Sequence, residues 1–169
     1  MGSEYEKGKI EKSIFVRFAA AAGLNFQSVE KQSPEEGKPD LKCMTDGKVI
    51  YFELTEACSE DVAKAISHPK SINCNDLSAE KSTDKSTATS SSTTNYPSDT
   101  DIKDYTSETY KKKINKRYSV SEPIDLLIYN VGRTLLTDDV LVNNVKALAK
   151  DNKGPFRKVW YFGEHVTEI

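Results

Sequence analysis

The stretch KPDLKCMTDGKVIYFELTE, residues 38–56, constrains the fold more than any other part of the chain. Two apolar runs flank Asp46-Gly47, which is the strongest short signal for a type I′ hairpin because both turn positions need positive φ. Strands are therefore predicted over residues 38–44 and 48–55. Pairing outward from this turn places Asp40 directly opposite Glu53.

Strand alternation divides the side chains of this hairpin between two faces. Like charges that face each other across a hairpin destabilise it by a few tenths to about 1 kcal/mol, so the two acids call for a compensating cation. A site with only oxygen donors suits Mg²⁺ or Mn²⁺. The alternative is that both acids lie at the solvated ends of their strands, as carboxylates usually do. One face is predicted to hold Asp40, Lys42, Val49, Tyr51, Glu53 and Thr55, and the other Ile50, Phe52 and Leu54.

The rest of the chain alternates between helical and strand patterns. Their order predicts an α/β fold, with a mixed central sheet flanked by helices, in a single domain spanning residues 1–169. Before the hairpin a helix is predicted from about Glu4 to Ala22 and a strand at Leu24–Val29, and after Glu56 a helix that runs to about Ser67. Further along, the pattern predicts a helix over 107–118, a buried strand over 124–131, a helix capped by Thr137 with apolar positions Val140, Val142, Val145, Leu148 and Ala149, and a last strand over 157–164.

A Ser/Thr-rich segment interrupts this pattern. Between residues 78 and 100, 13 of 23 residues are Ser or Thr, and large apolar side chains are almost absent. Such a segment cannot bury enough apolar surface to offset the entropy lost on ordering. Residues 76–104 are therefore expected to be a disordered insertion that can be deleted without unfolding the domain.

Composition excludes several classes of protein. No stretch approaches the ~18 consecutive apolar residues that cross a membrane, and the polar N-terminus lacks the apolar run of a signal peptide, so a cytoplasmic protein is expected. The three cysteines are odd in number and widely spaced, which argues against a disulfide framework and a zinc site. The net charge of −2 excludes a generally basic, DNA-coating protein, although a local basic patch can still bind nucleic acid.

The hairpin carries a further pattern at its two ends. Pro39-Asp40 before it and Glu53-Leu54-Thr55 within it resemble the motif of the PD-(D/E)xK, or restriction endonuclease-like, nuclease superfamily. The predicted order of elements, αβββαβ, is also that superfamily's core. The resemblance extends from about residue 10 to residue 129 and is interrupted by the insertion.

This resemblance implies metal-assisted hydrolysis of phosphodiester bonds in nucleic acid. Asp40 and Glu53 would hold Mg²⁺ or Mn²⁺. The backbone carbonyl of Leu54 and the side chain of Glu11, on the first helix, are the further metal ligands that it implies. The alternative for Glu11 is a solvated helix residue.

The chain departs from the superfamily's motif at Thr55, where the motif has a lysine that orients water and stabilises negative charge. A threonine hydroxyl cannot replace a cation. We prefer Lys42 as the third catalytic residue beside Asp40 and Glu53, because strand geometry places it on the face of Asp40. The other replacements considered are Lys38, opposite Thr55, and Lys113 or Lys116 from the following helix, and each of these lysines is alternatively an ordinary exposed residue.

The run Lys111–Lys113, followed by Lys116 and Arg117, is the only concentrated positive charge in the sequence. Lys112, Lys113 and Lys116 are predicted to contact the phosphates of nucleic acid, DNA in preference to RNA. The alternative is the solvated face of an amphipathic helix. No membrane partner is expected, and a homodimer is compatible with the sequence.

Two functions from different classes follow from these observations. The first is a divalent-metal-dependent nuclease with a displaced lysine, and the second is a catalytically inactive member of the same fold that serves as a binding or assembly module. Retention of both acids favours the nuclease, because a purely structural hairpin would gain from losing one of them. If the two acids only repel, Asp40→Asn or Glu53→Gln is expected to leave the metal-free protein as stable or slightly more stable.

Overall fold

The computed structural model describes residues 4–33, 36–59 and 104–169. These residues form a six-stranded mixed sheet in the order β1-β2-β3-β4-β5-β6. Successive strands are antiparallel from β1 to β3, parallel from β3 to β5, and antiparallel again between β5 and β6. The strands are β1 (Ser28–Lys31), β2 (Leu41–Thr45), β3 (Lys48–Glu56), β4 (Ile124–Tyr129), β5 (Phe156–Phe162) and β6 (Val166–Glu168), and the helices are α1 (Glu4–Ala21), α3 (Tyr105–Ile114) and α4 (Asp138–Asp151).

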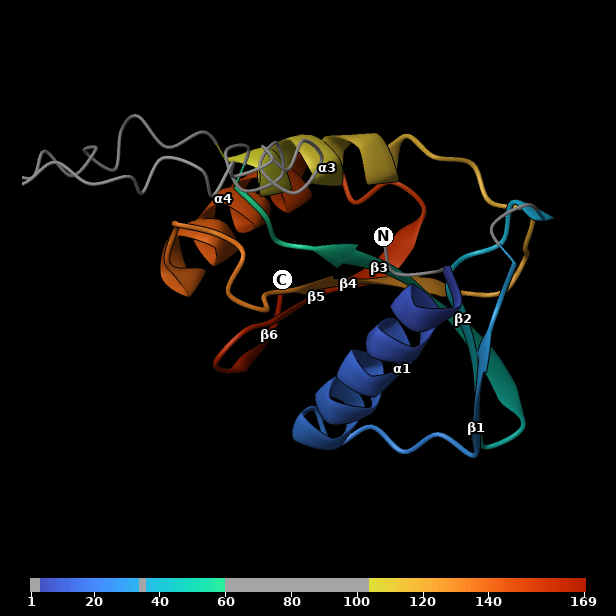
Figure 1. Ribbon diagram of the computed structural model, residues 1–169. Coiled ribbons are helices and arrows are strands. Elements are labelled where there is room, and N and C mark those ends of the chain that lie inside the picture. The colour runs from blue at the N-terminus through green and yellow to red at the C-terminus, as the bar shows by residue number, and fades with distance from the viewer. Residues whose placement is uncertain (1–3, 34–35, 60–103) are drawn as a thin grey trace, which may run out of the picture.

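The helices lie on both faces of this sheet, so that the molecule has three layers (Figure 1). α1 covers one face, where Phe15 and Phe18 pack against Phe52 and Trp160. α3 and α4 cover the other face, and Tyr110 from α3 shares that core with residues of α4 and of the central strands. The predicted α/β class, with a mixed sheet flanked by helices, is confirmed for the described residues.

The hairpin forms at the predicted turn. Asp46 and Gly47 have φ values of 48° and 72°, as a type I′ turn requires. Thr45 pairs with Lys48, and the predicted register continues to Leu41, which pairs with Phe52. The ladder ends there, so Asp40 lies one residue outside β2.

The predicted division of β3 into two faces is also confirmed. Tyr51 belongs to the core beneath α3 and α4, whereas Phe52 and Leu54 belong to the core beneath α1. Glu53 lies on the same face as Tyr51 and directs its side chain toward α3, where Lys113 binds it. The register of the hairpin and its alternation therefore place Glu53 under α3.

Several element boundaries differ from the sequence predictions. The strand expected at Leu24–Val29 forms later, at Ser28–Lys31, and Leu24 instead packs beside α1 from an irregular segment. The helix expected over 107–118 begins at Tyr105, because Asp104 caps it by accepting the backbone N–H of Ser107, and ends at Ile114.

The C-terminal part holds two further differences. In α4 the inward position is Leu141, which is buried, whereas the predicted Val140 is 40% exposed. Thr137 is the N-cap residue, as predicted, but its side chain makes no capping hydrogen bond. The strand expected to be the last is followed by β6, a short edge strand whose three residues are too few to show an alternating pattern.

Two predictions fall on the segment between residues 60 and 103. The helix expected after Glu56 does not begin there, because residues 57–59 are not helical and the N–H of Ala57 donates to the carbonyl of Tyr129; the rest of that helix, to about Ser67, lies outside the described residues. The insertion expected over 76–104 also lies outside them, apart from Asp104, which is ordered as the N-cap of α3. In the described ranges, no helix is long and apolar enough to cross a membrane.

Candidate functional site

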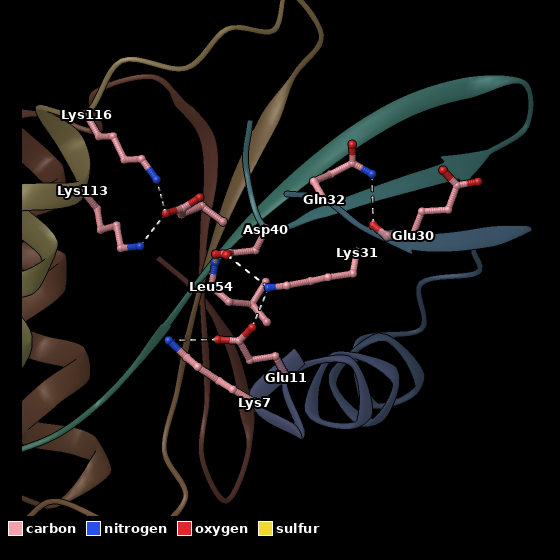
Figure 2. A network of polar contacts seen from close by, with 10 residues as sticks. Lys7, Glu11, Glu30, Lys31, Gln32, Asp40, Leu54, Lys113 and Lys116 are labelled. Carbon is pink, nitrogen blue, oxygen red and sulfur yellow. Dashed lines mark hydrogen bonds and ion pairs between the residues drawn. The ribbon is translucent and has the colours of Figure 1, made fainter. Parts of the chain in front are cut away.

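Asp40 binds the neighbouring strand through its side chain. The backbone ladder between β2 and β3 ends at Leu41. Beyond it the side chain of Asp40 continues the contact between the strands, because its Oδ2 accepts the backbone N–H of Leu54 at 2.8 Å. Its other oxygen, Oδ1, lies 3.3 Å from Nζ of Lys31 on β1. Asp40 is thus fixed at the end of the hairpin with both oxygens engaged (Figure 2).

Glu53 is the buried acid of the site, with 1% of its surface exposed. Its Oε1 accepts hydrogen bonds from two ammonium groups of the α3 region: Lys113 binds it, and Lys116 lies 3.0 Å away. Its Oε2 is buried and has no hydrogen-bond partner among the described residues. Unpaired buried polar atoms are rare in folded proteins, so this oxygen distinguishes Glu53 from an ordinary ion pair.

Tyr118 lies beside Glu53 at the end of the segment that follows α3. Burial, followed by the negative charge of Glu53 and the approach of the Tyr118 hydroxyl to that carboxylate, raises the pKa of Tyr118, and Asp40 contributes in the same direction. That hydroxyl is buried and faces the carboxylate of Glu53, although it makes no hydrogen bond of ordinary geometry within the described part of the chain. The amine of Lys116 lies 4.8 Å from the centroid of its ring. Tyr118 therefore lies within electrostatic reach of both carboxylates.

Glu11 joins the site through Lys31. Nζ of Lys31 lies 2.6 Å from Glu11 Oε2 and 3.3 Å from Asp40 Oδ1, so one ammonium group bridges α1 and the end of the hairpin. Burial opposes the charge of Lys31, but its hydrogen bonds and charge interactions with Glu11 and Asp40 outweigh that effect and raise its pKa. Lys7, one helical turn before Glu11, lies 3.8 Å from the other oxygen of the same carboxylate. Figure 2 shows this bridge on the α1 side and the lysines of the α3 region on the other.

The predicted repulsion between Asp40 and Glu53 is resolved inside the protein. Lys31 compensates Asp40, while Lys113 and Lys116 compensate Glu53. The expectation that removing either charge leaves the metal-free protein as stable or more stable is therefore wrong in its premise. Removing Glu53 leaves Lys113 and Lys116 without this partner, and removing Asp40 leaves Lys31 with Glu11 alone, so either loss is expected to destabilise.

The preferred catalytic lysine, Lys42, is not among the residues brought to the carboxylates. It pairs across the sheet with Tyr51, and no hydrogen bond or ion pair in the described ranges joins it to Asp40 or Glu53. Lys38 pairs with Glu36. Of the replacements considered, only Lys113 and Lys116 reach Glu53, because the packing of α3 brings Lys113 and the segment that follows the helix over the sheet from a distant part of the sequence.

The three lysines predicted to bind nucleic acid divide between two environments. Lys113 and Lys116 turn inward to Glu53, and Lys116 keeps 43% of its side chain exposed. Lys112 is exposed on another side of α3, with its amine 5.7 Å from the centroid of Tyr105. The basic run is therefore not one continuous solvated face.

The predicted acidic ligands, Glu11, Asp40 and Glu53, do not form a cluster of three in the described residues. No group of three or more His, Cys, Asp or Glu side chains that could hold a metal ion occurs in the described residues. Glu11 is separated from Glu53 by the bridge of Lys31 to Asp40, so a set of three acids is not formed. Leu54 contributes its backbone N–H to Asp40, and the predicted role of its carbonyl stays a prediction.

Two residues of the site were missed from the sequence, Lys31 and Tyr118. The signal for Lys31 was the pairing of β1 with β2, which places it opposite Leu41 and hence beside Asp40, but the strand was expected too early in the chain. Tyr118 is the last residue of the helix predicted over 107–118, and nothing local indicates that the helix ends before it.

Comparisons with protein-family models, with curated proteins and with solved structures find no match to this chain.

Proposed function

We propose that this protein is a divalent-metal-dependent nuclease, in which Asp40 and Glu53 hold Mg²⁺ or Mn²⁺ and Lys113 or Lys116 acts in place of the motif lysine. The observation that carries the proposal is the buried carboxylate of Glu53, which has two lysines on one oxygen and no hydrogen-bond partner for the other within the described residues. A purely structural ion pair gains nothing from an unpaired buried oxygen. The resemblance of the hairpin to the PD-(D/E)xK motif supports the same assignment.

The donor atoms suit a hard divalent cation. Both acids offer carboxylate oxygens, and Mg²⁺ is commonly held by one or two carboxylates together with water. Glu53 Oε2 is the oxygen available to a metal ion, since it makes no hydrogen bond to the described residues. The oxygens of Asp40 are engaged by Leu54 and Lys31. A divalent cation supplies Lewis-acid chemistry at such a site, activating water and stabilising negative charge on phosphoryl oxygens.

Lys113 and Lys116 supply the positive charge that the motif lysine would provide. Their ammonium groups lie within hydrogen-bond distance of Glu53, so they lie next to the place where a phosphate would meet the carboxylates. Fixed positive charge aimed at developing negative charge is a principal source of catalytic stabilisation. Lys113 is the more enclosed of the two, with 23% of its side chain exposed, and is the better placed for a fixed catalytic role. The partner is nucleic acid, and the expected homodimer and cytoplasmic location stay predictions.

A second function, a catalytically inactive binding or assembly module, is favoured by one observation. Thr55, at the position of the motif lysine, is buried, and the neighbouring acids are already neutralised by lysines. A protein that has lost its metal could retain such ion pairs. Metal binding therefore separates the two functions.

Mn²⁺ binding and cleavage together test the proposal. Wild-type protein should be stabilised by Mn²⁺ in thermal melts and should cleave labelled DNA or RNA oligonucleotides only when Mg²⁺ or Mn²⁺ is present. Asp40→Asn is a clean variant because the amide oxygen can still accept the N–H of Leu54 while the charge is lost. Glu30→Gln, at an exposed position of β1, is the matched control. No Mn²⁺ shift in wild-type protein, or equal shifts in wild type and Asp40→Asn, would favour the inactive module.

A further inference from the structure

A groove borders the surroundings of Glu53. It runs along the segment between α3 and β4 and the beginning of β5, and its volume is about 820 Å³. Its lining includes Lys116, Arg117, Tyr118, Glu122 and Arg157. The groove thus shares Lys116 and Tyr118 with the surroundings of Glu53.

Two contacts connect the wall of the groove to the carboxylate site. Lys116 extends from the lining to Glu53, at 3.0 Å. Ser119, between the lining residues Tyr118 and Val120, donates its backbone N–H to the carbonyl of Gly37 at 3.0 Å, which ties this segment to the loop that leads into Asp40. A molecule in the groove would therefore lie next to Lys116, whose amine contacts Glu53.

The charge of the groove is mainly positive and is held in place. Lys116 and Arg157 are anchored on the buried acids Glu53 and Asp125, yet 43% and 45% of their side chains remain exposed. Arg117 is exposed, and no acid pairs with it in the part of the chain that the structure describes. Glu122 is the single acid of the lining, and Ser121 occupies its carboxylate through both its N–H and its hydroxyl.

We propose that this groove binds one strand of nucleic acid through its phosphates and leads that strand to the Asp40–Glu53 site. The inference rests on the proposed function, because it takes the polyanion to be the substrate of that site. Arg117, together with the exposed parts of Lys116 and Arg157, suits a phosphate backbone, and each neutralised phosphate adds to the affinity. The volume falls within the range of pockets that enclose small ligands, so the groove suits the nucleotides of a single strand and not a duplex.

Binding measurements without metal test the groove separately from cleavage. Fluorescence anisotropy with a labelled single-stranded oligonucleotide, in EDTA, should give at least about tenfold weaker binding for Arg117→Glu. Arg117→Ala should lower the slope of log K against log salt concentration by about 0.7, the value of one phosphate contact on a single strand. Glu122→Lys should strengthen binding severalfold, because it reverses the only negative charge of the lining. Lys48→Glu, at the exposed tip of the hairpin, is the matched control. Its affinity for the oligonucleotide should fall less than that of Arg117→Glu.

Each outcome of this experiment is decisive. Thermal melts of the same variants verify that these exposed substitutions leave the fold intact. Equal binding by wild type and Arg117→Glu, or an equal loss in Lys48→Glu, would overturn the groove. Tighter binding of a duplex, or competition by inorganic phosphate at the concentration at which an unlabelled strand competes, would overturn the single-strand assignment. If binding depends on the groove but no metal-dependent cleavage occurs, the nuclease proposal is overturned and the groove proposal is retained. If wild type cleaves and Arg117→Glu binds as tightly as wild type, the groove proposal is overturned and the nuclease proposal is retained.

Discussion

Two buried acids lie on neighbouring strands of the sheet, and they differ in how their carboxylate oxygens are hydrogen-bonded. Glu53 on β3 and Asp125 on β4 are each 1% exposed. Asp125 is satisfied at both oxygens: Arg157 donates from Nε at 2.9 Å and from Nη2 at 2.7 Å, and Trp160 adds its indole N–H at 3.3 Å. Glu53 receives two lysines on one oxygen and nothing from the described residues on the other.

This difference shows how a structural acid and a candidate functional acid can be separated. A guanidinium matches both oxygens of a carboxylate with two parallel hydrogen bonds, and the result is a closed pair. An ammonium group acts as a point charge, so two of them can neutralise a carboxylate without occupying both of its oxygens. Burial alone does not distinguish Glu53 from Asp125, but hydrogen-bond satisfaction does.

The largest expected effect is on the closed pair. Asp125→Asn should lower the free energy of unfolding by about 3 kcal/mol, because it removes the charged partner of a bidentate, buried interaction. Urea denaturation measures this loss. The Mn²⁺ shift and cleavage should be retained by the folded variant, and a lost Mn²⁺ shift would show that Asp125 shares the function of Glu53.

A smaller loss of stability and a complete loss of function are expected at Glu53. Glu53→Gln should lower the free energy of unfolding by about 1–2 kcal/mol, since Lys113 and Lys116 lose their partner but can extend toward solvent. Stabilisation by Mn²⁺ and cleavage should disappear. The comparison with Asp125 breaks down if urea denaturation gives equal losses for the two variants and neither variant affects Mn²⁺ binding.

Removing one lysine should separate charge neutralisation from catalysis. Lys113→Met should change the free energy of unfolding by less than about 1 kcal/mol, because Lys116 still binds Glu53. Without a competing ammonium group, Mn²⁺ should bind about threefold to tenfold more tightly in calorimetric titration.

Cleavage by this variant should nevertheless fall by at least about tenfold, because a fixed positive charge is lost. Lys111→Met, an exposed lysine on the same helix, is the control. Unchanged cleavage in Lys113→Met would transfer the catalytic role to Lys116 or to neither lysine.

The smallest effect is expected at Tyr118. Its hydroxyl is buried without a hydrogen-bond partner among the described residues, so Tyr118→Phe should change the free energy of unfolding by less than about 0.5 kcal/mol. Urea denaturation in metal-free buffer tests this. A loss above about 1 kcal/mol would show that the hydroxyl makes a stabilising hydrogen bond to Glu53. Glu53 would then resemble Asp125 in having hydrogen-bond partners for both of its oxygens.

The sequence by itself determined the local features of this protein. Asp46-Gly47 specified the turn, and the strict period of two in a strand then fixed the pairing down to Leu41 and Phe52 and the opposite faces of Tyr51 and Phe52. These features depend on neighbours in the chain, and backbone geometry limits them to few alternatives. The helical and strand segments of the described part followed largely from the same local rules.

Only the tertiary structure decided which cations meet the acids. Lys31 reaches Asp40 through the pairing of β1 with β2, and Lys113 reaches Glu53, 60 residues away in sequence, through the packing of α3 on the sheet. Long, flexible lysine side chains carry no periodic signal that reveals their partner. Lys42, which strand geometry alone favoured, illustrates the limit: a shared face is a local property, whereas an ion pair requires the position of every neighbouring element.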